Sequence, residues 1–165
     1  MPLAAILLAI AAVISGCFGF VLLFGAPFVP TLSPQVAVAL DLLDLKPGQT
    51  LLELGCGDGI VLLAAAQRGI AVVGYELNPV LALIARWRTR QYRHLVRVIC
   101  GNFWSRGWPP ADGIFVFLLP RYMGKLHKKV MQYAHKPLRL ASFAFEIPEK
   151  VPSRELRGVF LYEYK

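Results

Sequence analysis

The fold of this 165-residue chain is decided by one stretch, Leu51-Leu52-Glu53-Leu54-Gly55-Cys56-Gly57-Asp58-Gly59. An apolar run ends in three glycines, which is typical of a buried strand that turns sharply beside a ligand, because glycine lets the backbone approach closely. A dinucleotide-binding loop would have a third glycine where Ile60 stands, and no GK[ST] sequence follows to indicate a phosphate-binding loop. The stretch therefore predicts a strand and a binding loop for another kind of cofactor.

Three carboxylates accompany this loop. Glu53 and Asp58 would repel a phosphate but attract an ammonium or a sulfonium, so they favour a cationic cofactor. Glu76 follows Gly55 by 21 positions, at the end of the next apolar run, where a carboxylate can accept both hydroxyls of a ribose. A carboxylate at the end of a strand is as often simply exposed to solvent, but the distance of Glu76 from the glycine loop in the sequence favours ligand binding.

Strand and helix patterns alternate after residue 45. We expect helices over 34–45, 60–68, 79–91 and 121–134, and strands over 50–54, 71–75, 96–100, 113–119 and 138–145. This order predicts an α/β fold, a Rossmann-like and mostly parallel sheet with helices on both faces. A last strand over 158–164 is expected as an antiparallel edge.

The first 40 residues carry no charged side chain, and all 18 Lys and Arg and 10 Asp and Glu come later. Residues 3–24 are interrupted by one polar residue, Ser15, and as a helix would cover about 33 Å, one bilayer core. We predict a single transmembrane helix within an anchor over 1–26, a proline-rich spacer over 27–34 and a catalytic domain over 35–165.

Three other interpretations of the apolar segment remain open: a cleaved signal peptide, a helix buried in a soluble core, and a lipoprotein signal ending at Cys17. The basic residues all follow the segment. The positive-inside tendency then places a catalytic domain in the cytoplasm, or in the mitochondrial matrix of a eukaryote.

The formal charge of +8 is concentrated in two groups of cations. These cations form solvated faces, contacts for anionic lipid headgroups, or an RNA-binding surface. RNA binding is disfavoured by the predicted anchor and by the lack of an added RNA-binding domain. Cysteines 17, 56 and 100 form no CxxC pair, so no metal site is indicated. The two groups are Arg86, Arg90, Arg93 and Arg97, and Lys125, Lys128, Lys129 and Lys136.

The glycine loop together with Glu76 resembles the cofactor site of the class I, seven-strand S-adenosylmethionine methyltransferases. The resemblance covers about residues 47–145 and implies S-adenosyl-L-methionine as the cofactor. It implies the following cofactor-binding residues: Glu53, Gly55, Cys56, Gly57, Asp58, Gly59, Glu76, Leu77, Asn102 and Phe103.

A narrower resemblance covers nearly the whole chain. Val29-Pro30-Thr31, the segment 74–79, Phe117-Leu118-Leu119-Pro120 and the segment 143–148 are similar to small membrane-anchored protein-lysine methyltransferases of mitochondria. Those enzymes modify the c-type subunit of ATP synthase and the adenine nucleotide carrier. The resemblance implies a membrane-protein substrate, with Pro120 and Tyr122 as catalytic-side residues that border the acceptor amine.

Two departures from the class I pattern affect these expectations. Asn102 stands where many relatives have an acidic residue for the adenine amino group, although its amide oxygen can accept the same hydrogen bond. One strand is expected after Phe145, where the full fold has a hairpin of two. A small-molecule (lipid or quinone-precursor) methyltransferase, an RNA methyltransferase and a non-catalytic cofactor-binding domain are the alternative functions.

Overall fold

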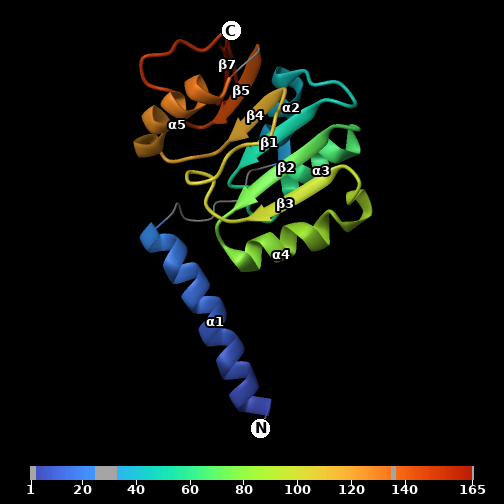
Figure 1. The fold of residues 1–165 in the computed structure, drawn as a ribbon, viewed down its shortest axis with the longest axis vertical. Helices are drawn as coiled ribbons and strands as arrows, with labels where there is room; N and C mark the ends of the chain where they lie inside the picture. The colour runs from blue at the N-terminus through green and yellow to red at the C-terminus, as the bar shows by residue number, and fades with distance from the viewer. Residues whose placement is uncertain (1–2, 25–32, 135–136, 165) are drawn as a thin grey trace.

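A computed structural model describes residues 3–24, 33–134 and 137–164. Its strands form one seven-stranded sheet in the order β3-β2-β1-β4-β5-β7-β6 (Figure 1). The helices are α1 (Leu3–Phe24), α2 (Ser33–Leu43), α3 (Ile60–Gln67), α4 (Pro79–Arg88) and α5 (Pro120–Tyr133), with a 3-10 turn η1 at Arg90–Tyr92. The strands are β1 (Thr50–Leu54), β2 (Ala71–Glu76), β3 (Val96–Cys100), β4 (Gly113–Val116), β5 (Leu138–Phe143), β6 (Arg154–Leu156) and β7 (Val159–Tyr164).

The first five strands are parallel, which confirms the Rossmann-like sheet predicted from the alternation of strand and helix patterns. Pairing of Leu54 with Tyr75 and with Val116 brings the carboxyl ends of β1, β2 and β4 to one edge. Ligands of such sheets bind at this edge. The glycine loop and Glu76 therefore leave their strands side by side.

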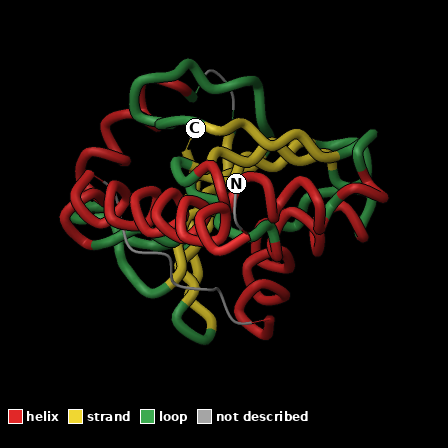
Figure 2. The backbone as a smooth tube through the Cα atoms, turned by 90° about the horizontal axis from the view of Figure 1, so that it is seen from below, coloured by secondary structure: helices red, strands yellow, loops and turns green. Residues whose placement is uncertain are grey.

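Helices cover both faces of the sheet (Figure 2). The first core cluster joins α2 and α3 to one face, and Ala85 of α4 belongs to it. The second cluster joins α5 to the other face. Three residues of α2 form an apolar stripe that is buried in the first cluster: Val36, Leu40 and Leu43.

The connection from β3 to β4, residues 101–112, contains no helix and covers its part of the sheet with aromatic side chains. Tyr75 of β2 donates a hydrogen bond from its hydroxyl to the carbonyl of Gly107 (2.8 Å), and Tyr133 of α5 donates to that of Pro109 (2.7 Å). These bonds satisfy backbone oxygens that a helix would have satisfied internally.

The C-terminal edge differs from the prediction. β7 is antiparallel to β5 as expected, but β6 pairs with its other side, so β7 is not the edge strand and the expected single strand is a hairpin. The signal for β6 was weak because its three residues are all exposed and lack apolar alternation. Its turn is Arg157-Gly158, both at positive φ (50° and 76°), the geometry of a two-residue hairpin turn.

Several elements are shorter than predicted. β4 ends at Val116 rather than at 119, and β5 ends at Phe143 because Ala144 has a φ of 68°, which a strand cannot contain. α4 ends at Arg88, and its expected last turn is the separate 3-10 turn η1.

α1 extends away from the α/β domain (Figure 1). Within the described residues no helix combines the length and the apolar character needed to cross a membrane, so the structure does not support the spanning anchor predicted over 1–26. Most of the predicted spacer, residues 27–32, lies outside the described residues.

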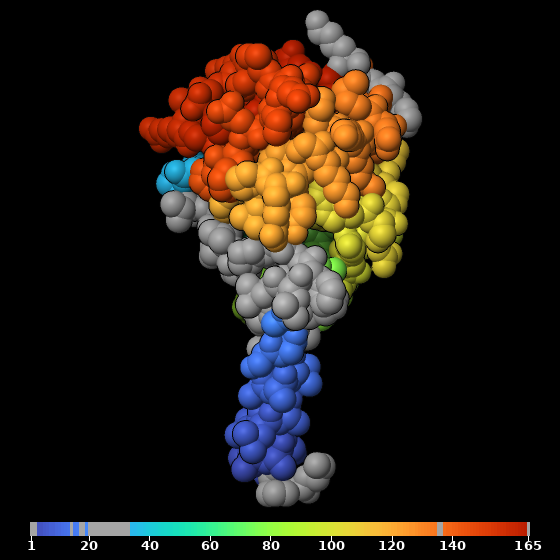
Figure 3. Space-filling model, turned by 90° about the vertical axis from the view of Figure 1, so that its left-hand side faces the viewer, coloured from blue at the N-terminus to red at the C-terminus, as the bar shows by residue number. Residues whose placement is uncertain are grey.

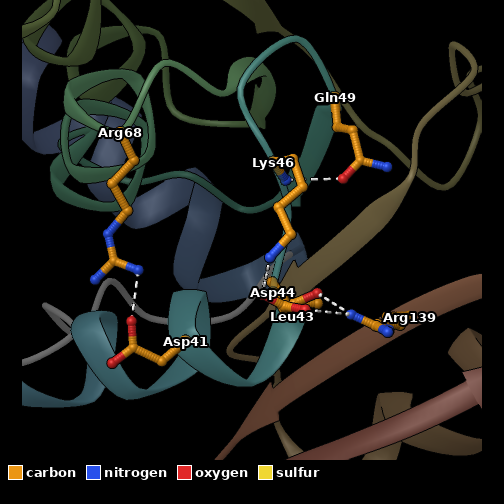
Figure 4. A network of polar contacts seen from close by, with 7 residues as sticks. All are labelled: Asp41, Leu43, Asp44, Lys46, Gln49, Arg68 and Arg139. Carbon is orange, nitrogen blue, oxygen red and sulfur yellow. Dashed lines mark hydrogen bonds and ion pairs between the residues drawn. The ribbon is translucent and has the colours of Figure 1, made fainter.

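A polar network fixes the end of α2 on the sheet (Figure 4). Arg139 of β5 donates to the carbonyl of Leu43 (3.0 Å) and lies 3.6 Å from the carboxylate of Asp44. A hydrogen bond from Lys46, its charge and that of Arg139 hold the pKa of Asp44 below its usual value. Exposed pairs of this kind add little stability each, so the network mainly orients the turn into β1.

Gly74 of β2 provides a test of how closely the glycine loop and α3 pack against β2. A Cβ at this position would lie 2.9 Å from Cβ and Sγ of Cys56 and 2.9 Å from Cδ2 of Leu62. We expect Gly74→Ala to lower the free energy of unfolding by about 1–3 kcal/mol through overpacking. The matched control is Gly124→Ala, in the middle of α5, where a Cβ meets nothing within 4 Å and helix propensity should add about 0.5–1 kcal/mol. Urea unfolding measures both, and equal effects would contradict the packing described here.

Candidate active site

The glycine loop makes a sharp turn that leaves open space above it. The N–H groups of Gly55 and Cys56 both donate to the carbonyl of Tyr75 (2.9 and 2.8 Å), which anchors the loop to β2. Gly55 has a φ of 94°, and a Cβ there would meet no described atom within 4 Å. A side chain is therefore absent where a ligand can approach the backbone.

Glu76 connects the glycine loop to the start of α4. One carboxylate oxygen accepts the N–H of Gly57 and the other accepts that of Asn78, both at 2.8 Å. The Asn78 side chain in turn caps α4 by accepting the N–H of Val80 (2.9 Å). Each oxygen of Glu76 retains a lone pair, so this fixed carboxylate can still accept the hydroxyls of a ribose.

Burial raises the pKa of Glu76, against the lowering effect of hydrogen bonds from the backbone of Asn78, Gly57 and Leu77. Glu53 is more strongly affected, since burial and then the charges of Glu76 and Asp58 raise its pKa well above the usual value. Its Oε2 atom is buried and has no hydrogen-bond partner among the described residues. A buried carboxylate without a partner is costly, and the ammonium of an amino-acid ligand would satisfy it. The site thus fits a cationic cofactor.

Two other loop side chains have partners within the protein. The Cys56 side chain packs against Gly74, and burial raises the pKa of its thiol, so its contribution to binding is its backbone. The carboxylate of Asp58 forms an ion pair with Arg88 of α4 (2.9 Å). Gly59 contacts α4 as well, because a Cβ there would lie 2.9 Å from that of Ala85.

The predicted adenine-side residues lie beside Glu76. The N–H of Gly101 donates to the carbonyl of Glu76 (2.7 Å), which brings the end of β3 to the same edge. Asn102 is exposed, and its amide oxygen accepts the N–H of Trp104 (2.9 Å), so the predicted acceptor already caps its own turn. Phe103 and Leu77 are half-buried at this edge. Their contacts with the cofactor stay predictions.

The two acceptor-side residues lie at the start of α5. Pro120 is its first residue and is exposed. The ring of Tyr122 is 6.0 Å from that of Trp104, so it packs toward the connection 101–112.

An aromatic cluster, Phe117, Phe143 and Phe145, was not assigned a role from the sequence. The Phe117 centroid lies 4.7 Å from that of Phe143 and 6.4 Å from that of Phe145. Because Val116 pairs with Leu54, Phe117 follows at the level of Gly55, beside the glycine loop. The sequence signal was present in segments 117–120 and 143–148, but only the fold shows that they meet.

Figure 3 shows this side of the molecule, where green atoms, from the region of β2 and α4, are visible between the yellow segment near residue 105 and the orange segment near residue 120.

The sheet order, the glycine loop and the paired carboxylates define a class I S-adenosylmethionine-dependent methyltransferase. A structure of an RNA methyltransferase from Salinibacter ruber with S-adenosyl-L-homocysteine is similar, with a TM-score of 0.76, 28% identity, and coverage of 82% of this chain and 92% of that one. The family model of the ANTKMT methyltransferase domain matches residues 53–154. The chain belongs to this family.

Curated relatives include lysine methyltransferases. The lysine N-methyltransferase of the ATP synthase c-type subunit from Xenopus laevis is 32% identical over 129 residues, which is 76% of this chain and 56% of the relative. The adenine nucleotide translocase lysine N-methyltransferase of Mus musculus is 32% identical over 135 residues, with the same coverage. The chain spans about half the length of these relatives. The comparisons confirm the predicted family, enzyme class and cofactor.

Glu76 can be tested by calorimetry with S-adenosyl-L-homocysteine. Glu76→Gln removes the charge and turns the amide NH₂ toward one of the two N–H donors, so we expect affinity to fall at least tenfold, about 1.4 kcal/mol. Glu155→Gln on exposed β6 should leave it unchanged. Unaltered binding by folded Glu76→Gln would exclude Glu76 from the ribose site, and preferential binding of NAD would contradict the cofactor assignment.

The raised pKa of Glu53 predicts a pH effect. Between its unfolded value and its higher folded value the folded protein holds the extra proton, so the ligand-free protein loses stability as pH rises through that window. Glu53→Gln should remove the part of this stability loss that comes from Glu53, and the part that comes from Glu76 should remain. Urea unfolding at a series of pH values measures the difference, and identical pH profiles for both proteins would show that Glu53 is not perturbed.

Proposed function

We propose that this protein is an S-adenosylmethionine-dependent protein-lysine N-methyltransferase that acts on a membrane protein. The observation that carries the proposal is the aromatic cluster beside the glycine loop, because it offers an apolar surface rather than a set of polar contacts to the acceptor. The names of the two similar lysine methyltransferases support the substrate class.

The aromatic cluster is held rigidly. Ser142 donates from its hydroxyl to the carbonyl of Phe145 (2.6 Å), and the N–H of Ile147 donates to the hydroxyl of Tyr162 (2.9 Å). These bonds fix the turn after β5 that carries Phe143 and Phe145. Aromatic faces attract an ammonium and its methylated products, so the cluster suits an alkylamine acceptor.

The chemistry is a displacement at carbon. S-adenosylmethionine supplies the methyl group: the nitrogen–carbon bond forms as the carbon–sulfur bond breaks, and the amine must first lose a proton. Phenyl walls lower the pKa of a lysine amine by desolvation, which favours its neutral form. The proton leaves to water. Positioning of the amine above Gly55 provides the remaining catalysis.

We further infer that α1 attaches the enzyme to a bilayer, with the catalytic domain on the cytoplasmic or matrix side. Support comes from exposed apolar side chains along its described first half: Leu3, Ile6, Leu7, Leu8, Ile10 and Val13. Burial of such side chains in lipid is favourable by about 25 cal/mol per Å². The attached domain would meet acceptors in the same membrane at high effective concentration.

The test is methylation of cognate membranes with radiolabelled S-adenosylmethionine, followed by mass spectrometry of the labelled protein. We expect label on lysine with the wild-type enzyme. The Phe117→Ala enzyme should transfer at least tenfold less label while its affinity for S-adenosyl-L-homocysteine stays unchanged. Met131→Ala, on an exposed site of α5, is the control. Removal of residues 1–26 should spare cofactor affinity and reduce labelling. Label confined to lipid, or full activity of Phe117→Ala, would contradict the proposal.

RNA methylation is a second candidate because the Salinibacter ruber structure is of an RNA methyltransferase. A basic surface supports it: Lys125 lies over the ring of Trp104 (4.5 Å), and Lys129 over that of Trp108 (5.0 Å). Aromatic and cationic groups of this kind also bind single-stranded RNA. The same labelled reaction with total RNA decides between the two, since label in RNA and none in protein would favour this candidate.

A further inference from the structure

α4 has an apolar stripe on the side that faces away from the sheet. Val80, Leu83, Ile84 and Trp87 follow the spacing i, i+3, i+4, i+7, the pattern of a buried helix face. The buried side of α4 is instead a second stripe, formed by Leu81, Ala82 and Ala85.

The outer stripe is open to solvent. Leu83 is 64% exposed, Trp87 65% and Ile84 38%. Contiguous apolar side chains on a folded surface mark an interaction site, whereas single ones need no explanation. The 10-residue helix thus has two apolar faces, and packing within the described residues covers one of them.

Cations surround this stripe. The Arg90 guanidinium lies over the Trp87 ring, 4.5 Å from its centroid, and donates to the Trp87 carbonyl (3.0 Å). Arg86 is exposed beside it and donates to the carbonyl of Val98 (3.2 Å). No Asp or Glu occurs between Glu76 and Asp112, so this surface is positive along its length.

The stripe lies on the side of the domain from which α1 extends. α4 forms the lower border of the domain in Figure 1, α1 contacts α4, and α1 projects below it. A bilayer that holds α1 would therefore lie close to the outer face of α4.

We propose that the outer face of α4 docks on an anionic membrane surface. Leu83, Ile84 and Trp87 enter the boundary between headgroups and acyl chains, as in helices that lie in the membrane plane, and Arg86 and Arg90 contact lipid phosphates. Tryptophan suits this depth because its ring is apolar and its N–H is polar. Aliphatic side chains at the centre of the stripe favour lipid over RNA, which would need stacking faces and cations alone.

Docking would fix the active site relative to the bilayer. α4 is joined to the glycine loop by the Asp58–Arg88 ion pair and by the bonds of Glu76 to Gly57 and Asn78. A membrane contact along α4 thus holds the cofactor edge at a set height and orientation. The inference adds a second contact to the proposed attachment through α1, and it does not depend on which acceptor is methylated.

The experiment reconstitutes the full chain in vesicles of phosphatidylglycerol and phosphatidylcholine that contain brominated lipid. Quenching specific to Trp87 is the difference between the wild type and Trp87→Phe. We expect clear Trp87 quenching in the wild type and at least fivefold less in the docking variant Leu83→Ser/Ile84→Ser. Quenching should also fall when the vesicles contain phosphatidylcholine alone, and when the protein carries Arg86→Gln/Arg90→Gln. Met131→Ser and Val151→Ser, at exposed apolar sites on other elements, should retain it.

The outcomes separate this inference from the proposed function. Protein that floats with vesicles but shows no Trp87 quenching overturns α4 docking and leaves attachment through α1 intact. Equal quenching in the docking variant and the controls also overturns it. A self-associated protein whose Trp87 is shielded from bromine, and which dissociates with Leu83→Ser/Ile84→Ser, assigns the stripe to a second copy of this chain instead.

Discussion

The carboxylate of Glu76 is the interaction on which the rest of the site depends. It receives the N–H of Gly57 from the glycine loop and that of Asn78 from the start of α4, and both donors lie in segments that follow parallel neighbouring strands. Without this bridge the loop and the helix would each present an unsatisfied N–H at a buried edge, a cost of about 1–3 kcal/mol per group. The same carboxylate is placed to hold a ribose, so the group that shapes the pocket also binds in it.

The strands and helices whose residues show a local apolar pattern could be predicted from the sequence. The apolar run into Gly55 and the acid at position 76 identify their strands, because burial and sharp turning leave few alternative residues. The hairpin strand β6 could not be found this way, since its exposed residues carry no periodic signal. The sequence patterns predict no helix over 101–112 and the structure has none, but the bonds of Tyr75 and Tyr133 that fix this connection join distant segments and could not be predicted.

The site shows the same division. Backbone roles in the glycine loop follow from residue type, whereas side-chain partners follow from the fold: Asp58 was expected beside the cofactor and pairs with Arg88, and Asn102 caps its own turn. The aromatic cluster joins the ends of β4 and β5, and α4 shows that helical periodicity predicts an apolar face without saying what covers it. The spacing of residues in the sequence defines the faces of a helix or strand, and the three-dimensional fold decides which of these faces pack together.

The central claim is that Glu76 holds the loop in its binding conformation before any ligand arrives. Amide hydrogen exchange of the ligand-free protein tests this most directly, because Gly57 and Asn78 donate to Glu76 alone among the described bonds. The account predicts slow exchange at both amides in the wild type and fast exchange at both in Glu76→Ala, with the amides of β1 unchanged. Fast exchange of Gly57 and Asn78 in the wild type would contradict it.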